Sequence, residues 1–259
     1  MKKNILYFLA HQDDEFGCFI KLDQDISSEN TYVFYLTSGG NNISKRNRLS
    51  ARDKESLKTL KKLGLKKKNI FFLGRELNID HYSLYLNLEK VYQKITKIIK
   101  KIGEPDSIIT HSWEGGHEDH DACNLIGRKI AYNYKIIKKS FQFSQYNAYQ
   151  TKLLFFKVFN QIDNKKGKKF YAKLEKRIFF IRLLFIYSSQ IKIWLGLYPF
   201  IIFHYLFRGY NYMEKLNNDK FIKKPHSEKL LYEIRKFCTF KKFRNKTKFF
   251  LIKSSQDKF

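Results

Sequence analysis

Four short apolar segments constrain the fold more than any other feature of this sequence. They are residues 4–10, 31–37, 69–73 and 106–110. Continuous apolar runs of this length are typical of strands buried on both faces, as in a parallel sheet. Between them and after them lie three segments with the spacing of amphipathic helices, at residues 45–64, 84–102 and 117–133. The alternation predicts an α/β fold with a doubly wound, mostly parallel, Rossmann-like sheet and helices on both faces.

Composition excludes several classes of protein. The 25 Phe and 17 Tyr exclude a disordered chain, because disordered chains are poor in aromatic residues. The three cysteines are widely spaced and odd in number, which excludes a disulfide framework and favours a reducing, cytoplasmic location. No apolar stretch reaches the roughly 18 residues that a transmembrane helix needs, and the first residues lack the pattern of a secretory signal.

Positive charge is concentrated in the second half of the chain. Residues 151–259 hold 26 Lys or Arg against 7 Asp or Glu, a net charge of +19, whereas residues 1–150 have a net charge of +8. Residues 178–207 are dense in aliphatic and aromatic side chains, which is typical either of a core or lid helix or of a membrane-interfacial one. We expect an anionic membrane surface to contact 178–207 and the basic tail at 239–259, unless the charge reflects only a lysine-rich surface.

Two polar segments follow predicted strands, at the point where each strand ends. Residues 11–15 (HQDDE) follow the first strand, and residues 111–120 (HSWEGGHEDH) follow the fourth. Ligands of doubly wound sheets bind at the carboxyl ends of strands, so both segments are expected in one region. A solvated turn is the ordinary explanation of a lone Asp-Asp pair, but two such segments at two strand ends make chance a poor explanation.

The residue types in these segments suit a mononuclear metal site with three protein ligands and one open position. His11 and Asp14 are three residues apart in one loop, and His120 can supply the third ligand from the other loop. The histidines favour Zn²⁺ or Fe²⁺ over Mg²⁺, which prefers oxygen ligands. Asp13 is then free to act as a general base, and His117, one helical turn before His120, can stabilise an oxyanion.

These segments resemble two motifs of the PIG-L/LmbE-like zinc-dependent de-N-acetylases. Residues 10–15 (AHQDDE) are similar to the AHPDDE signature, and residues 117–120 (HEDH) are similar to the HxDH motif. The threonine–histidine pair that usually opens the second motif is present at 110–111, and residues 52–64 are similar to the family's RxxE…LG helix. The resemblance covers about residues 3–135.

The resemblance implies a role for each residue of these motifs. Zinc would be held by three residues, His11, Asp14 and His120. Asp13 would be the general base, and His117 would stabilise the oxyanion or protonate the leaving amine. Asp119 would orient His117, and Arg52 would lie near the polar head of the substrate.

The chain departs from the family pattern at two places. Gln12 replaces the usual proline, a change that loosens the turn but removes no ligand. The tyrosine that some members carry just before HxDH has no counterpart, because Gly115 and Gly116 stand there. We expect Trp113, or a residue from the C-terminal half, to occupy that part of the substrate site, unless the role is absent.

The expected function is that of a zinc-dependent hydrolase that removes the acetyl group from an N-acetylated amino sugar of a bacterial-type cell-surface glycan or glycolipid precursor. Residues 1–150 would form the catalytic core with the metal site. Residues 151–259 would form a basic, aromatic-rich C-terminal extension that completes the same domain or covers it as a lid.

Two alternatives to this function stay open. One is a soluble small-molecule deacetylase of a thiol-cofactor pathway, and the other is a non-catalytic basic protein that binds a membrane. Nucleic acid is not expected as a partner, since the sequence has no RNP, zinc-finger or helix-turn-helix signature. The expected location is the cytoplasm, either free or peripheral on the inner face of the membrane.

Overall fold

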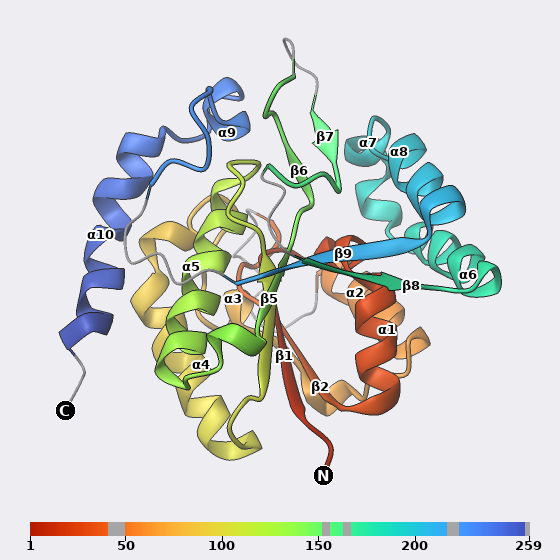
Figure 1. Cartoon of the computed structure of the whole chain (residues 1–259), viewed down its shortest axis with the longest axis horizontal. Coiled ribbons are helices and arrows are strands. Elements are labelled where there is room, and N and C mark those ends of the chain that lie inside the picture. The colour runs from red at the N-terminus through yellow and green to blue at the C-terminus, as the bar shows by residue number, and fades with distance from the viewer. Residues whose placement is uncertain (41–49, 152–155, 163–166, 217–222, 257–259) are drawn as a thin grey trace.

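The computed structural model describes residues 1–40, 50–151, 156–162, 167–216 and 223–256. A seven-stranded sheet runs through the molecule in the order β3-β2-β1-β4-β5-β9-β8 (Figure 1). Its strands are β1 (Asn4–Leu9), β2 (Asn30–Tyr35), β3 (Ile70–Phe72), β4 (Ser107–His111), β5 (Phe141–Phe143), β8 (Gly167–Tyr171) and β9 (Tyr210–Lys215). The first five strands are parallel to their neighbours, and β9 pairs antiparallel with both β5 and β8. The prediction of a mostly parallel sheet is therefore confirmed.

Helices cover both faces of the sheet, as predicted (Figure 1). One face carries α3 (Leu73–Glu76), α4 (Leu88–Ile102), α5 (Glu118–Asn133), α9 (Leu231–Ile234) and α10 (Phe240–Gln256). The other carries α1 (Phe19–Ser28), α2 (Ala51–Lys62), α6 (Leu174–Leu184), α7 (Ile191–Trp194) and α8 (Tyr198–Phe203). Part of the helix expected at 45–64 lies outside the described residues, and α2 begins after Ser50, whose side chain caps it by accepting from the Asp53 N–H.

Short turns of helix and a small second sheet join these elements. The 3₁₀ turns are η1 (Asp14–Gly17), η2 (Lys67–Asn69), η3 (Leu84–Leu86), η4 (Ile137–Lys139) and η5 (Ser188–Gln190), and η6 (His204–Arg208) is a π-helical turn. The second sheet consists of β6 (Tyr146–Asn147) and β7 (Lys157–Val158), which pair antiparallel.

The central strands are buried on both faces, which explains their continuous apolar sequences. In β1, Leu6 and Phe8 enter the core beneath α4 and α5, whereas Tyr7 and Leu9 enter the core beneath α1 and α6. Alternate side chains of a strand point to opposite faces, so a strand between two helical layers needs apolar residues at every position.

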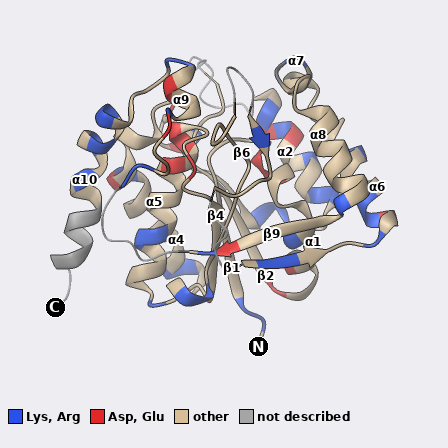
Figure 2. Ribbon diagram, turned by 45° about the horizontal axis from the view of Figure 1, so that its top comes forward, with Lys and Arg blue, Asp and Glu red and all other residues tan. Residues whose placement is uncertain are grey.

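The C-terminal part of the chain takes part in the same sheet and the same cores. It supplies β8 and β9, and residues of α6, α7 and α8 complete the core around Tyr7. The expected basic tail instead forms α10, where Phe243 and Phe250 are buried in the core beside α5. Figure 2 shows Lys and Arg on helices on both sides of the sheet, including α6 and α10. Within the described residues no helix has the length and apolar character needed to cross a bilayer.

The strand order defines where a ligand can bind. The chain passes from β1 outward to β2 and β3, and then returns to β4 on the other side of β1. Such a reversal of strand order opens a crevice at the carboxyl ends of the two central strands. Both polar segments of the sequence begin there, directly after β1 and at the end of β4.

Candidate metal centre and active site

The loop after β1 is fixed by hydrogen bonds among its own residues. The Asp14 carboxylate accepts from the His11 backbone N–H at 2.6 Å, which closes the turn. The Gln12 side chain is buried and donates to the Thr37 carbonyl oxygen at 3.1 Å. The residue that departs from the family's proline therefore holds the loop through its side chain, whereas the sequence led us to expect a looser turn.

Asp13 occupies an unusual backbone conformation in this loop. Its φ angle is 144°, a region that non-glycine residues rarely adopt. Its N–H donates to the Glu15 carboxylate at 3.0 Å. Glu15 is fully buried and also accepts from the hydroxyls of Tyr35 and Tyr187, at 2.7 and 2.6 Å. These bonds overdetermine the position of Glu15, which in turn holds the strained Asp13.

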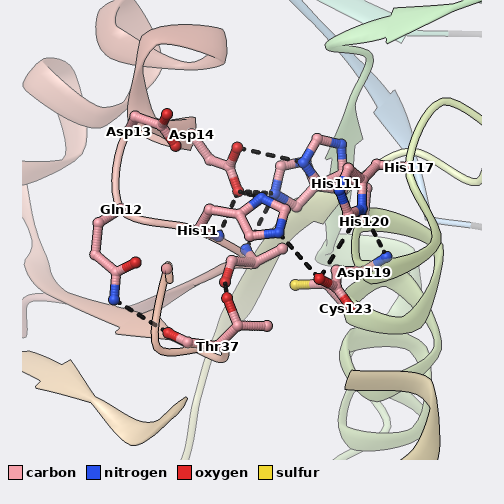
Figure 3. Close-up of polar contacts among 12 residues, drawn as sticks. His11, Gln12, Asp13, Asp14, Thr37, His111, His117, Asp119, His120 and Cys123 are labelled. Atoms are coloured by element: carbon pink, nitrogen blue, oxygen red, sulfur yellow. Dashed lines mark hydrogen bonds and ion pairs between the residues drawn. The ribbon is translucent and has the colours of Figure 1, made fainter. Parts of the chain in front are cut away.

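The loop after β4 leads into the N-terminus of α5. The Asp121 carboxylate accepts from the backbone N–H groups of Glu114 and Gly115, both at 3.1 Å, and so ties the loop to the helix. His117 is the N-cap residue of α5, and His120 lies in its first turn. The two imidazoles therefore project from the same helix end toward the loop after β1 (Figure 3).

His11, Asp14 and His120 converge on one point, as Figure 3 shows. His11 Nδ1 lies 3.4 Å from Asp14 Oδ2, and His120 Nε2 lies 3.3 Å from Asp14 Oδ1. The three ligand atoms all lie within 4.8 Å of one another, and all three residues are buried. Two ligands about 2.1 Å from a tetrahedral zinc ion lie roughly 3.4 Å apart, so the spacing fits such an ion.

The His120 imidazole provides an independent test of this fit. The residue is fully buried and its Nδ1 has no hydrogen-bond partner, whereas its Nε2 faces Asp14 Oδ1 at 3.3 Å without a well-directed hydrogen bond. Buried polar atoms are normally paired, so an imidazole with such weak partners beside a carboxylate indicates a missing ligand. Burial lowers the pKa of His120 to about 3, helped by the neighbouring His111. Its ring is therefore neutral, the form that binds a metal.

His11 lies between two carboxylates. Its Nε2 is 3.1 Å from Asp119 Oδ2, and its Nδ1 faces Asp14. Burial by itself would lower the pKa of His11, but Asp14 and Asp119 raise it to about 10. The negative field that favours a proton on His11 would equally favour a cation. The Asp119 carboxylate, expected to orient His117, lies 4.0 Å from His117 Nδ1 and makes closer contacts with His11 and with the N–H groups of Tyr82 and Leu84.

The proton of His117 can be assigned from its hydrogen bonds. The Asp119 backbone N–H donates to His117 Nδ1 at 3.0 Å, so Nδ1 must carry a lone pair. Burial and the nearby His11 hold the pKa of His117 well below its usual value, so the ring is neutral and its proton is on Nε2. His117 Nε2 lies 3.1 Å from His81 Nε2, which accepts this proton in a hydrogen bond. His117 is therefore a fixed hydrogen-bond donor.

Asp13 is held by Arg52. Arg52 Nη2 donates to Asp13 Oδ1 at 2.7 Å, and the rest of the guanidinium donates to the carbonyl oxygens of Gln12 and Gly39. Burial raises the pKa of Asp13 to about 7, although Arg52 acts in the opposite direction. A carboxylate that titrates near neutral pH suits general acid–base chemistry. Arg52, expected near the polar head of the substrate, thus donates three hydrogen bonds, two to the loops and one to Asp13.

Trp113 lies away from the converging residues. Its indole N–H donates to the Lys223 carbonyl oxygen at 2.9 Å, and its ring packs against Phe240 and Phe243 of α10. The space beside Gly116 is filled by Tyr146 of β6 instead, because a Cβ on Gly116 would lie 1.9 Å from the Tyr146 carbonyl oxygen. The Tyr146 ring lies 5.3 Å from that of His120. Tyr146 therefore lies beside both Gly116 and His120 and is a candidate for the role that Trp113 was expected to fill.

Sequence reasoning missed three residues of this site. His81 forms a second possible ligand group with His11, His117 and Asp119. Tyr146 faces His120, and His111, noted only as part of a motif, lies 3.0 Å from Asp14 and stacks on His120. His111 had a signal in the sequence, since it ends a strand. His81 and Tyr146 stand apart from both motifs, and only the fold brings them in.

Fold and site together define the protein as a doubly wound α/β protein with a candidate catalytic metal centre at the switch point of its sheet. The model of the family PIG-L: GlcNAc-PI de-N-acetylase matches residues 6–131. This part of the chain, which carries both loops of the site, is thus similar to the PIG-L family. No curated protein matches the chain.

Several solved structures share the fold at low sequence identity. The zinc-inhibited form of teicoplanin deacetylase Orf2 is 16% identical with a TM-score of 0.55, over 81% of this chain and 96% of that chain. The A40926 pseudoaglycone deacetylase Dbv21 is 13% identical with a TM-score of 0.55, over 83% and 98%. The N,N'-diacetylchitobiose deacetylase from Pyrococcus horikoshii is 17% identical with a TM-score of 0.55, over 83% and 85%. At these identities the likeness shows the fold.

Proposed function

We propose that this protein is a zinc-dependent deacetylase that removes the acetyl group from an N-acetylated amino sugar. The convergence of His11, Asp14 and His120 on one point, with Asp13 beside them, carries the proposal. The family description names a de-N-acetylase of a GlcNAc conjugate, and the structural neighbours are named as deacetylases, which supports this reaction type.

The donor set fits a zinc ion held by His11 Nδ1, one or both oxygens of Asp14, and His120 Nε2. When bound, zinc supplies Lewis-acid chemistry, since it polarises a carbonyl group and lowers the pKa of water to about 7. Asp119, hydrogen-bonded to His11 Nε2, would keep the His11 ring oriented with Nδ1 toward the ion. Fe²⁺ fits the same donors.

Asp13 and His117 would carry the proton transfers. Asp13 takes a proton from water as the water oxygen adds to the acetyl carbon, and Arg52 keeps the carboxylate in place. His117 would donate its Nε2 proton, which His81 accepts in the free protein, to the carbonyl oxygen of bound substrate, which becomes negative as the carbon turns tetrahedral. Asp13 then delivers a proton to the amine nitrogen, the C–N bond breaks, and acetate is released.

We further propose that the sugar belongs to a cell-surface glycan or glycolipid precursor presented on an anionic carrier or at a membrane face. The net charge of +27 supports an anionic partner. The C-terminal half carries most of that charge, and it supplies the helices that pack beside the loop of Asp13 and Asp14.

Acetate release from a panel of N-acetylhexosamine conjugates tests the function. The panel contains free, nucleotide-linked and lipid-linked sugars. The protein is first stripped of metal with a chelator and then reloaded with Zn²⁺ or Fe²⁺. We expect the chelated protein to be inactive and one metal ion per chain to restore turnover on at least one conjugate.

His120→Ala serves as the paired variant, because it removes one proposed ligand without touching Asp13. It should bind less than one metal ion per chain and release no acetate. Acetate release by the chelated protein, or full metal content in His120→Ala, would contradict the proposed centre.

A further inference from the structure

Residues 174–208, here called the helical cap, expose an unusual amount of apolar surface. The cap comprises α6, η5, α7, α8 and η6. It holds eight of the fourteen large hydrophobic side chains that are exposed among the described residues, and Leu195 and Phe207 are 69% and 66% exposed. Scattered apolar residues on a surface are ordinary, but a concentration in one segment marks an interaction site.

The exposed side chains form two stripes at helical spacing. Phe200, Phe203 and Phe207 follow one another at intervals of three and four residues along α8 and η6, so they share one helix face. Leu174 and Ile178 do the same on α6, and their stripe continues to Phe185 at its end. The Phe185 ring stacks on Tyr198 at 5.7 Å, which joins the end of one stripe to the start of the other.

The fold does not need these outward faces. The opposite faces of the cap enter the core beneath the sheet, where Phe180, Ile201 and Tyr205 are fully buried. Trp194 lies in the segment 178–207 that was expected at a membrane, but it is only 3% exposed and packs edge-on against Phe16 at 4.9 Å. The cap is therefore anchored on one side and apolar on the other, as an interfacial segment is.

The net positive charge of the cap favours an anionic partner. Residues 174–208 contain five Lys or Arg and one acidic residue, Glu175. Four of the five basic side chains are exposed, among them Arg182 and Lys192. Apolar stripes bordered by exposed basic residues match an anionic bilayer, because the basic groups meet lipid phosphates while the rings enter the acyl boundary.

The cap lies beside the candidate active site. Tyr187 donates to the buried Glu15, and Trp194 packs on Phe16, both next to Asp14 in η1. In Figure 1, α7 and α8 stand near β7 at the end of the molecule toward which the central strands point. The basic tail cannot share this surface, because α10 lies on the opposite side of the sheet (Figure 1).

We propose that the helical cap docks the protein on an anionic lipid bilayer, with the active site at the membrane face. The inference that a lipid-linked sugar is the substrate rests on the proposed function, whereas the docking itself does not. The free energy of binding between the cap and the bilayer should have two additive parts. One is electrostatic and is weakened by salt, and the other is apolar and does not depend on salt.

Vesicle co-sedimentation of the full chain tests the docking. The vesicles are phosphatidylcholine alone or with phosphatidylglycerol, each at low and high salt. We expect strong binding to the anionic vesicles at low salt and weaker but measurable binding at high salt. Phe203→Ser with Phe207→Ser should lower the partition coefficient about tenfold or more at either salt concentration. Arg182→Ser with Lys192→Ser should lower it by about fivefold per residue, at low salt only.

Matched controls lie outside the cap. Leu86→Ser with Phe249→Ser removes two equally exposed apolar side chains, and Lys97→Ser with Lys100→Ser removes two exposed charges from α4. Both controls should bind vesicles like the unaltered protein, and circular dichroism checks that every variant is folded.

Three results would overturn the docking proposal. The first is no sedimentation of the unaltered protein with either vesicle, and the second is equal loss in cap and control variants. The third is self-association through the cap, seen as a dimer in sedimentation velocity that the Phe203/Phe207 variant dissociates. Acetate release from a water-soluble conjugate is measured in parallel, so a failure of docking and a failure of the proposed function are distinguished.

Discussion

The two loops of the metal centre and the helical cap use their side chains in opposite ways. The loops bury ionisable groups and give many of them specific polar partners, as Asp119 has in His11 and two backbone N–H groups. The cap exposes apolar groups such as Phe207, which has no role in the core. The orientation of each loop side chain thus depends on specific partners, whereas the outer face of the cap depends only on the apolar character of its side chains.

This difference separates two kinds of substitution. A change in a loop should alter turnover and leave the surface unchanged, because each loop residue acts through its orientation. A change on the outer face of the cap should alter membrane binding and leave turnover on soluble substrate unchanged. A change on the inner face of the cap should alter neither directly, but should lower the free energy of unfolding.

The largest effect is expected for Asp13→Asn. Asparagine keeps the shape of the side chain but cannot take a proton, so turnover should fall roughly a hundred- to ten-thousand-fold while metal content is retained. Acetate release and elemental analysis measure the two quantities on the same sample. Asp23→Asn in α1 is the control, because Asp23 pairs with Lys176 and contacts no residue of the site, so its turnover and metal content should match those of the unaltered protein. Metal loss in Asp13→Asn would make Asp13 a ligand instead of a base.

The inner and outer faces of the cap can be compared directly by Phe180→Ala and Phe203→Ala. Phe180 is fully buried and stacks on Phe19 at 5.9 Å, so its truncation should lower the free energy of unfolding by about 3–5 kcal/mol. Phe203 is 54% exposed, and its truncation should change that energy by less than about 0.5 kcal/mol. Urea unfolding measures both. Equal losses would mean that the outer stripe is part of the core.

His117→Ala tests the hydrogen-bond donor of the site. Loss of a donor to a developing oxyanion lowers turnover by roughly a hundred- to a thousand-fold. His117→Gln keeps an N–H group on a side chain of similar reach, so part of the turnover should return. Both variants should keep their metal. If alanine and glutamine behave alike, the Nε2 proton of His117 is not used in the reaction.

The smallest effect is expected for His81→Ala. His81 accepts one hydrogen bond from His117, and one such bond contributes about 0.5–1.5 kcal/mol. Turnover should therefore fall by about twofold to tenfold, with no loss of metal, and the value follows from acetate release at saturating substrate. Loss of metal in this variant would instead indicate that the second group of possible ligands, with His81, holds an ion.

The sequence was most informative where burial is complete. The strands β1, β2 and β4 have continuous apolar sequences because both of their faces are covered, and they were predicted on that ground. The strands β8 and β9 were not predicted, since their antiparallel pairing at the sheet edge leaves Lys168 and Lys169 exposed and breaks any apolar run.

The site residues also fall into two groups, those that the sequence pattern revealed and those that only the fold revealed. His11, Asp14 and His120 could be found because each lies directly after a recognisable strand or in a motif at such a position. His81 and Tyr146 reach the site through loops whose path depends on tertiary packing, and no local pattern marks them. In the cap, aromatic residues surround the helices on all sides, so the sequence could not tell Trp194, which is buried, from Phe203, which is exposed.

The backbone at Asp13 sets fold stability and turnover against each other. Glycine adopts a φ of 144° without steric strain, whereas any other residue is strained there. Asp13→Gly would therefore relax the loop but remove the proposed base. A chain under selection for stability alone would therefore drift toward glycine at this position. In the proposed reaction, the residue that carries the backbone strain is therefore also the residue that moves the proton.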